Sequence, residues 1–426
     1  MNILTIVYFV AWLSVFVHYV RKHNNIKAYG TIVLSYVIYS FLSIIDYSTH
    51  AEKYDNITFF PFVYLFVLLI IALIPIKKYD DSGNLRLQRI NPMVLYIVFS
   101  LFLISTLVVL PSAINRIQHA WETILASDDG ASELYTEMHL RDSINANRNA
   151  GIWGFFNIVR YLLFEICVFC FFYYLTFPKR NKILIALLLG SFFLDILISF
   201  SNGGRTTSTM DAFTILMTYL IYHQFMSNDV KKSAKKFLIL LGAIFLLMTL
   251  TITVSRTINR EGGTADGIID YLGQGNLYFN QYAIHSAGER DGDRTCNVFK
   301  RLLGFDNVPN SVTGVRMKHS NMKISDHNFT TFIGDFIIDF GPVVTVLIIV
   351  LFTLLFTYLT KTKGTKISIE QLLLIQLVAD ICMHGGMYLF YYSYSGNYIL
   401  LMYIVFYYVF KLNRVNDVLL PKQIQK

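Results

Sequence analysis

The stretch Ser255-Arg256-Thr257-Ile258-Asn259-Arg260 ends one long apolar run, and Asp326-His327-Asn328 begins the next, which contains Asp339-Phe340-Gly341. The residues between these two motifs form the longest polar interruption in an otherwise hydrophobic chain. Arg256 and Arg260 are four residues apart, so they share one face wherever the helix continues. His327 lies at the mouth of the following apolar run, which places a titratable imidazole beside an intramembrane segment.

Composition identifies the broad class. The chain has 426 residues, of which 54% are hydrophobic and only 15% are charged, with a mean hydropathy of +0.49. Soluble domains carry about 25% charged residues, so we expect an integral membrane protein. The net charge of +8 fits lysines and arginines gathered on one membrane side. No basic run is interleaved with exposed aromatic residues, so no nucleic-acid partner is expected.

Eleven apolar segments approach the length of about 17–25 residues that crosses a bilayer. They predict an all-α, polytopic, single membrane domain over residues 1–426, with no soluble domain. The segments are Ile3–Val20, Gly30–Ile45, Phe59–Ile76, Pro92–Pro111, Gly154–Phe177, Ile183–Phe200, Thr206–Phe225, Phe237–Ser255, Phe329–Thr360, Ile367–Leu389 and Asn397–Phe410.

The charges of the connections predict the orientation. Every odd-numbered connection is basic, for example Lys231, Lys232, Lys235 and Lys236 after the seventh segment, whereas the others are acidic, mixed or very short. The positive-inside rule then places the N-terminus outside and the C-terminus in the cytoplasm. Residues 112–153 and 256–328 become external loops, the second of which bears part of the predicted site.

Nine charged or titratable residues within or directly beside the apolar segments fall in the outer half of the predicted membrane. They are Arg160, Glu165, Asp195, Arg205, Asp211, Asp335, Asp339, Asp380 and His384. Such residues mark function or a paired structural site. Their one-sided distribution favours a pocket open to the outer leaflet over an ion pathway.

Several of these residues have a second interpretation. Asp195, Asp211 and Asp380 could pair with arginines, and Arg160 could have a structural partner. Arg205 follows a glycine turn at a helix start, where backbone N–H groups and a guanidinium favour an anion, although an interfacial anchor is the alternative. Snorkelling is the alternative for Arg256 and Arg260, and His327 could be an ordinary loop histidine.

Metal and redox sites are not predicted. Cys167 and Cys170 form a CxxC within an apolar segment and lack the partners of a zinc or redox site. There is no dense carboxylate cluster; Asp291-Gly292-Asp293 is only a weak candidate for a divalent cation. The prediction therefore includes no cofactor and no metal.

Three short sequence motifs carry a resemblance to a known family. The motifs are Ser201-Asn202-Gly203-Gly204-Arg205-Thr206, Ser255-Arg256-Thr257, and His327-Asn328 followed by Asp339-Phe340-Gly341. Together with the long external loop, they resemble the motifs of Wzy-type polymerases of O-antigen and capsular repeat units. More distantly they resemble the O-antigen ligases. The resemblance covers the whole topology and implies a GT-C-like, metal-independent and inverting membrane glycosyltransferase. It implies the outer face of the bacterial cytoplasmic (inner) membrane as its location.

The resemblance also implies residue roles. Arg205 and Arg256 would hold the lipid diphosphate, and His327 would be the catalytic base. Substrate-binding roles fall to Arg260, Arg160, Asn328, Asp339 and Asp195. The implied partners are undecaprenyl-diphosphate-linked glycan donor and acceptor, membrane lipids and a chain-length-regulating co-polymerase. Pro342 directly follows Gly341 where a ligase often has further motif residues, which favours the polymerase.

Two alternative functions remain open. An O-antigen ligase would use the same donor but transfer it to lipid A core. A flippase or exporter of the lipid-linked oligosaccharide would predict pseudo-symmetric halves and polar residues on both sides of the membrane midplane. The sequence shows neither the pseudo-symmetric halves nor the polar residues on both sides that a flippase or exporter would predict.

Overall fold

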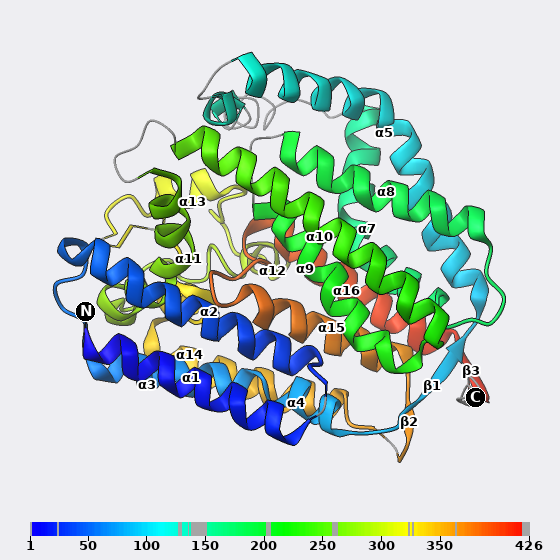
Figure 1. Cartoon of the computed structure of the whole chain (residues 1–426), viewed down its shortest axis with the longest axis horizontal. Coiled ribbons are helices and arrows are strands. Elements are labelled where there is room, and N and C mark those ends of the chain that lie inside the picture. The colour runs from blue at the N-terminus through cyan, green and yellow to red at the C-terminus, as the bar shows by residue number, and fades with distance from the viewer. Residues whose placement is uncertain are drawn as a thin grey trace. The chain divides into compact units, whose positions relative to one another are not determined.

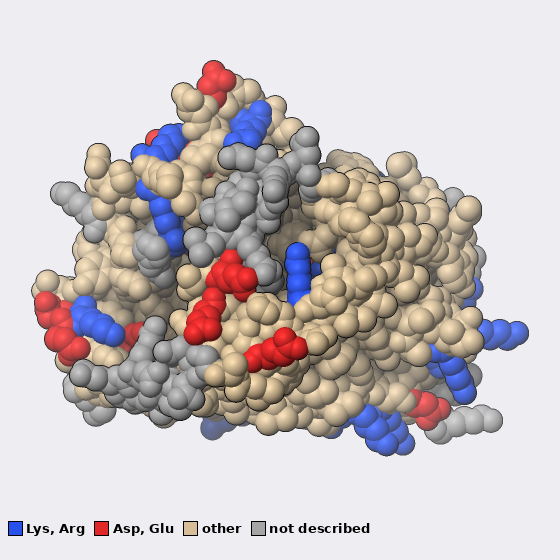
Figure 2. Space-filling view, turned by 90° about the horizontal axis from the view of Figure 1, so that it is seen from above, with Lys and Arg blue, Asp and Glu red and all other residues tan. Residues whose placement is uncertain are grey.

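A computed structural model describes residues 2–23, 25–126, 130–134, 136–137, 151–201, 206–257, 263–322, 324–325, 328–362 and 364–419. Within these ranges, the side chains of residues 206, 256–257, 263–265 and 416–419 are not described. Helices dominate the structure (Figure 1). Figure 2 shows Asp, Glu, Lys and Arg side chains in separate groups among mostly uncharged residues. The prediction of a mainly α-helical, multi-pass membrane protein is confirmed.

Eight helices among the described residues are long and apolar enough to cross a membrane. They are α1 (Ile3–Lys22), α2 (Ala28–Thr49), α5 (Pro92–Ala126), α7 (Ile152–Tyr174), α8 (Lys182–Ser201), α10 (Asn228–Thr257), α14 (Thr331–Leu359) and α16 (Ser393–Leu412). Helices α3 (Phe59–Ala72) and α4 (Ile74–Asp81) make a ninth span if their 45° bend is one broken crossing.

Two predicted segments form shorter helices. Helix α9 (Thr206–Tyr222) has 17 residues and α15 (Ile369–His384) has 16. At about 1.5 Å per residue each is roughly 25 Å long, below the ~30 Å hydrocarbon core. The count of eleven spans therefore stays a prediction.

The connections contain elements that the sequence analysis did not predict. They include α11 (Gly263–Gln281), α12 (Asn297–Leu302), α13 (Val312–Lys318) and the short 3-10 helices η1 (Ala51–Lys53), η2 (His223–Phe225) and η3 (Ala283–His285). Strands β1 (Arg86–Ile90), β2 (Lys366–Ile367) and β3 (Arg414–Leu419) form a sheet in the order β2-β1-β3. β1 pairs with β2 in parallel and with β3 antiparallel.

The chain divides into two compact units built from interleaved segments. Unit 1 comprises Met1–Leu85, Ile268–Gly364 and Gln371–Tyr407, and unit 2 comprises Arg86–Gly267, Thr365–Glu370 and Tyr408–Lys426. In unit 1, α1 packs against α2 and α3, and α14 packs against α3 and α4 (Figure 1). The fully buried Trp12 joins these helices, because its ring lies 4.7 Å from Tyr36 and 4.9 Å from Phe66, centroid to centroid.

In unit 2, α5 packs along α7 and α8, and α9 lies against α7, α8 and α10. A phenylalanine cluster fills this packing, with Phe192 of α8 5.7 Å from Phe102 of α5 and 5.8 Å from Phe164 of α7. Helix α5 passes through Pro111 and continues to Ala126. The first part of the predicted external loop 112–153 is therefore helical.

Helix α14 is kinked at Gly341, whose φ of 78° and ψ of 166° interrupt the helix before Pro342. A side chain here would be strained by the positive φ and would meet the Ala287 carbonyl oxygen at 3.1 Å. The residues before the kink are mostly buried, whereas Val343 and Leu351 beyond it are exposed apolar residues. The kink therefore separates a protein-facing part of α14 from a part suited to face lipid.

Candidate functional site

The described residues between Gly263 and Ser325 form a folded polar segment that includes α11, α12 and α13. From Ile268 onward it belongs to unit 1, where two buried asparagines of α11 fix it to the N-terminal helices. Asn280 accepts a hydrogen bond from the Thr58 N–H at 2.9 Å and donates to the Thr58 carbonyl at 2.8 Å. Asn276 donates to the Ser43 hydroxyl at 3.1 Å. These bonds hold α11 against α2 and the start of α3.

Arg290 locks the same segment to α14. Its Nε lies 2.6 Å from Oδ1 of Asp339, and its Nη2 lies 3.7 Å from Oδ1 of Asp335. All three side chains are buried. The two acids are four residues apart and so lie on one face of α14. An arginine buried between two carboxylates offsets much of the cost of removing those charges from water.

The remaining carboxylate oxygens also have partners. Oδ2 of Asp339 accepts hydrogen bonds from the backbone N–H and the hydroxyl of Thr295, at 2.8 and 2.7 Å. Oδ2 of Asp335 accepts from the Leu389 N–H at 2.7 Å. Asp339 therefore has structural partners, and its predicted substrate contact stays a prediction. Arg290 was not among the predicted site residues, because it lies in a polar segment, where an arginine carries no burial signal.

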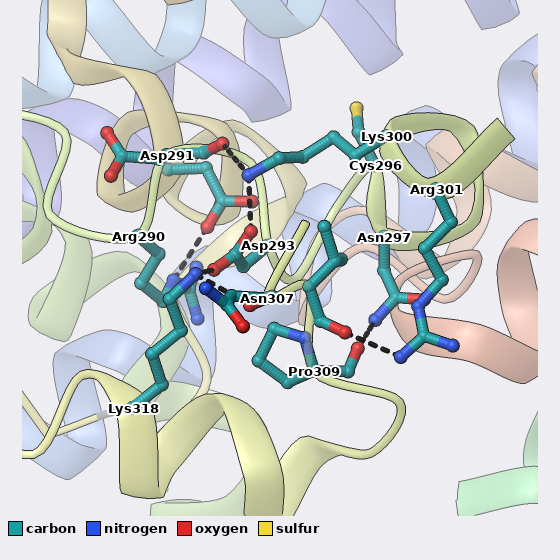
Figure 3. Close-up of polar contacts among 12 residues, drawn as sticks. Arg290, Asp291, Asp293, Cys296, Asn297, Lys300, Arg301, Asn307, Pro309 and Lys318 are labelled. Carbon is teal, nitrogen blue, oxygen red and sulfur yellow. Dashed lines mark hydrogen bonds and ion pairs between the residues drawn. The ribbon is translucent and has the colours of Figure 1, made fainter. Parts of the chain in front are cut away.

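Asp293 ties α12 to α13. Its carboxylate is buried and accepts hydrogen bonds from Lys300, from Lys318 at 2.6 Å and, in the matching tautomer, from His319 Nε2 at 3.0 Å. Figure 3 shows the two lysines reaching it from different elements. Burial alone would raise the pKa of Asp293, but these hydrogen bonds outweigh burial and lower it. With Lys300 and Lys318 against one carboxylate, the group has an excess of positive charge.

Arginines and tyrosines meet beside this group. The Arg294 guanidinium lies 4.3 Å from the centre of the Tyr392 ring, and that of Arg301 lies 5.7 Å from Tyr394. Both distances suit a cation–π interaction. Tyr394 in turn packs against Tyr398 at 4.8 Å. Tyr394 is 38% exposed and Arg301 is also exposed, whereas Arg294 is buried. The surface therefore presents one guanidinium group beside an aromatic ring.

Most of the residues predicted to bind the diphosphate or to act as the base lie outside the described part of the chain. Arg205, Arg260 and His327 lie outside the described residues. Arg256 belongs to the last turn of α10, but its side chain also lies outside them. The exposed Asn328 hydrogen-bonds to Tyr278, whose hydroxyl donates to the Ser325 carbonyl at 2.8 Å. The base and diphosphate contacts stay predictions.

Arg160 and Asp195 lie together in unit 2. They form an ion pair between α7 and α8 in which the Arg160 side chain is buried and the Asp195 side chain is 10% exposed, and Arg160 also donates to the Asn157 side chain at 3.1 Å. The alternative that Asp195 pairs with an arginine is thus confirmed. Each residue has a structural partner, and their predicted substrate contacts are not tested by this geometry.

One His and carboxylate group among the described residues has metal-like spacing. The ligand atoms of Asp46, His50 and Asp270 lie within 4.8 Å of one another. Asp46 already contacts His50 at 2.8 Å and Tyr54 at 3.3 Å, and Asp270 pairs with Lys53 at 3.3 Å. These partners satisfy the group with the chain's own side chains. In Asp291-Gly292-Asp293, the weak candidate for a divalent-cation site, Lys300 and Lys318 already bind the Asp293 carboxylate.

Comparison of the chain with protein-family models, with curated proteins and with solved structures finds no match. Fold and site together define a class: a multi-pass, mainly helical membrane protein. Its polar segment is locked onto a spanning helix by buried ion pairs, and two of its arginines lie over tyrosine rings.

Proposed function

We propose that this protein is a GT-C-like membrane glycosyltransferase that polymerises oligosaccharide repeat units carried on undecaprenyl diphosphate, at the outer face of the bacterial cytoplasmic membrane. The observation that carries the proposal is the placement of the exposed Arg301 over Tyr394, next to the buried Arg294 over Tyr392, in a segment anchored to α14. Guanidinium groups bind phosphate oxygens, and tyrosine faces offer an apolar surface with a polar edge to sugar rings.

The proposed chemistry is a direct displacement. The acceptor sugar hydroxyl attacks the anomeric carbon of the donor glycan, a new glycosidic bond forms, and the bond from that carbon to the diphosphate oxygen breaks. The hydroxyl proton passes to His327, the proposed base. Arg205 and Arg256 stabilise the diphosphate as its negative charge grows, which lowers the barrier because the interaction strengthens in the transition state.

A glycan ladder tests this proposal. A strain deleted for the gene is complemented at matched expression with wild type, Arg205→Ala, Arg256→Ala or His327→Ala. Single-repeat glycan in the deletion strain, with a ladder restored by wild type and lost in the variants, supports polymerisation and the three roles. Lys179→Ala is the matched control, since Lys179 is an exposed cation in a connection predicted to be cytoplasmic, and it should restore the ladder.

Other outcomes exclude the proposal or part of it. Complete loss of lipid A-linked glycan in the deletion strain, including the single repeat, would indicate a ligase or a flippase instead. A normal ladder from His327→Ala would remove that residue as the base. The arginine roles would then stand, and a group other than His327 would have to take the proton of the acceptor hydroxyl.

A further inference from the structure

The tip of the polar segment exposes apolar side chains. We call Leu302, Leu303, Gly304 and Phe305 the apolar tip. Leu302 is 68% exposed, Leu303 76% and Phe305 57%. Adjacent exposed side chains of this size are unusual on a surface that faces water and commonly mark a contact site.

The tip is held in this exposed form by its backbone. The Gly304 N–H donates to the Arg301 carbonyl at 3.0 Å, and the Phe305 N–H donates to the Lys300 carbonyl at 3.0 Å. This is the hydrogen-bond pattern of a Schellman motif, and Gly304 has the positive φ of 83° that the motif requires. A Cβ on Gly304 would meet nothing within 4 Å, so the turn projects into open space.

Side chains clamp the base of the tip as well. The Arg301 guanidinium donates to the Val308 carbonyl at 2.5 Å, and the Asn297 amide donates to the Pro309 carbonyl (Figure 3). The Lys300 ammonium group also lies 5.8 Å from the centre of the Phe305 ring. The apolar side chains are thus presented by a braced turn.

The position of the tip relative to a spanning helix identifies what covers it. Asn397, in the first turns of α16, accepts a hydrogen bond from the Val298 N–H at 3.0 Å and donates to the Thr295 carbonyl at 2.9 Å. Arg301 lies over Tyr394, at the start of the same helix. The end of a spanning helix marks the membrane–water boundary, where tyrosines are enriched. Helix α12 and its tip therefore lie at that boundary.

We infer that the apolar tip is a membrane-interface anchor that inserts Leu302, Leu303 and Phe305 among the lipids beside the start of α16. Exposed apolar side chains flanked by cations are the pattern of interfacial insertion, and Lys300 and Arg301 immediately precede the tip. The lipid bilayer is the occupant. The inference depends on the membrane-spanning fold and not on the proposed glycosyltransferase activity.

Depth-dependent quenching tests the anchor. The full chain carrying Leu303→Cys is labelled with an environment-sensitive fluorophore and placed in phosphatidylcholine and phosphatidylglycerol nanodiscs, with or without nitroxide-bearing lipids. The native cysteines interfere little, because Cys167, Cys170 and Cys382 are buried. Burial raises the pKa of the remaining thiol, Cys296, and so slows its labelling. Unsubstituted protein carried through the same labelling measures any residual signal.

We expect lipid-borne nitroxide to quench the Leu303→Cys probe at least twofold more than a probe at Asn310→Cys, an exposed polar position in the same segment. Phe305→Cys should behave as Leu303→Cys does, which guards against a local effect of one label. Equal quenching at positions 303 and 310, or no quenching at 303 and 305, overturns the inference. The tip would then be a surface for a protein partner.

Discussion

The Nε atom of Arg290 lies 2.6 Å from the Asp339 carboxylate, and neither side chain is exposed. This contact joins a segment between two predicted spans to the buried part of α14, and Asp335 adds a second carboxylate to the same guanidinium. The ion pairs of Arg290 consequently fix the polar segment to α14. Because these charges are buried, the guanidinium and the carboxylates each depend on the other to offset the cost of burial.

Replacement of Arg290 with methionine should destabilise the protein severely. It leaves Asp339 and Asp335 buried without their cation, which typically costs about 3–5 kcal/mol. The expected result is a large fall in the thermal unfolding midpoint in detergent. Lys53→Met is the control, because it breaks an exposed pair with Asp270 worth less than about 1 kcal/mol. Equal midpoints for the two variants would contradict the role assigned to Arg290.

Gly341→Ala should also lower stability. A Cβ at this positive φ is strained, at a cost of about 1–3 kcal/mol. Gly190→Ala offers a matched comparison in α8, where an added Cβ would meet nothing within 4 Å and should be neutral or stabilising by up to about 1 kcal/mol. Thermal unfolding of both variants checks the pair. The kink would be dispensable if Gly341→Ala matched wild type.

The Asp293 group predicts an acid-dependent loss of stability. The folded-state pKa of Asp293 lies below its ordinary value of 3.8. Its stabilising effect is therefore fully present above that value and is lost as pH falls through the folded-state pKa. Asp293→Asn should lower stability by about 1–2 kcal/mol at neutral pH and show a flatter decline in acid.

Unfolding midpoints measured from pH 7 downward check this prediction. The control Asp306→Asn removes an exposed carboxylate of the same segment and should keep the wild-type profile. An acid profile of Asp293→Asn that superimposes on wild type would show that the lysine contacts contribute no net stability.

Metal removal should have little effect. Asp46, His50 and Asp270 have partners in Tyr54, Lys53 and one another. We expect EDTA, or added Mn²⁺ or Zn²⁺, to leave the unfolding midpoint unchanged. A metal-dependent rise in the midpoint that disappears in Asp46→Asn would instead establish a cation site at the end of α2.

The Arg160–Asp195 pair can be tested for structure and for substrate binding separately. Asp195→Leu alone leaves a buried guanidinium and should cost about 3–5 kcal/mol, whereas Arg160→Met with Asp195→Leu should recover most of that loss. A stable double variant that still makes a glycan ladder would assign the pair to structure. A stable double variant without a ladder would support the predicted substrate contacts.

Sequence reasoning predicted the helical membrane fold because long apolar runs have few alternatives in a bilayer. Each predicted apolar segment overlaps a described helix. The strands were missed because β2 has only two residues and acquires its pairing from residues remote in sequence. Similarly, Asp335 and Asp339 stood out as charges in an apolar run, but Arg290 became recognisable only when folding buried it.

The three-stranded sheet joins segments that are far apart in the sequence. β1 lies between β2 and β3, so both of its edges are paired. Because Gln88 of β1 pairs with Leu419 of β3, one edge of the central strand stays open until β3 has been made. A chain truncated before Arg414 would leave that edge of β1 open to pairing with another molecule.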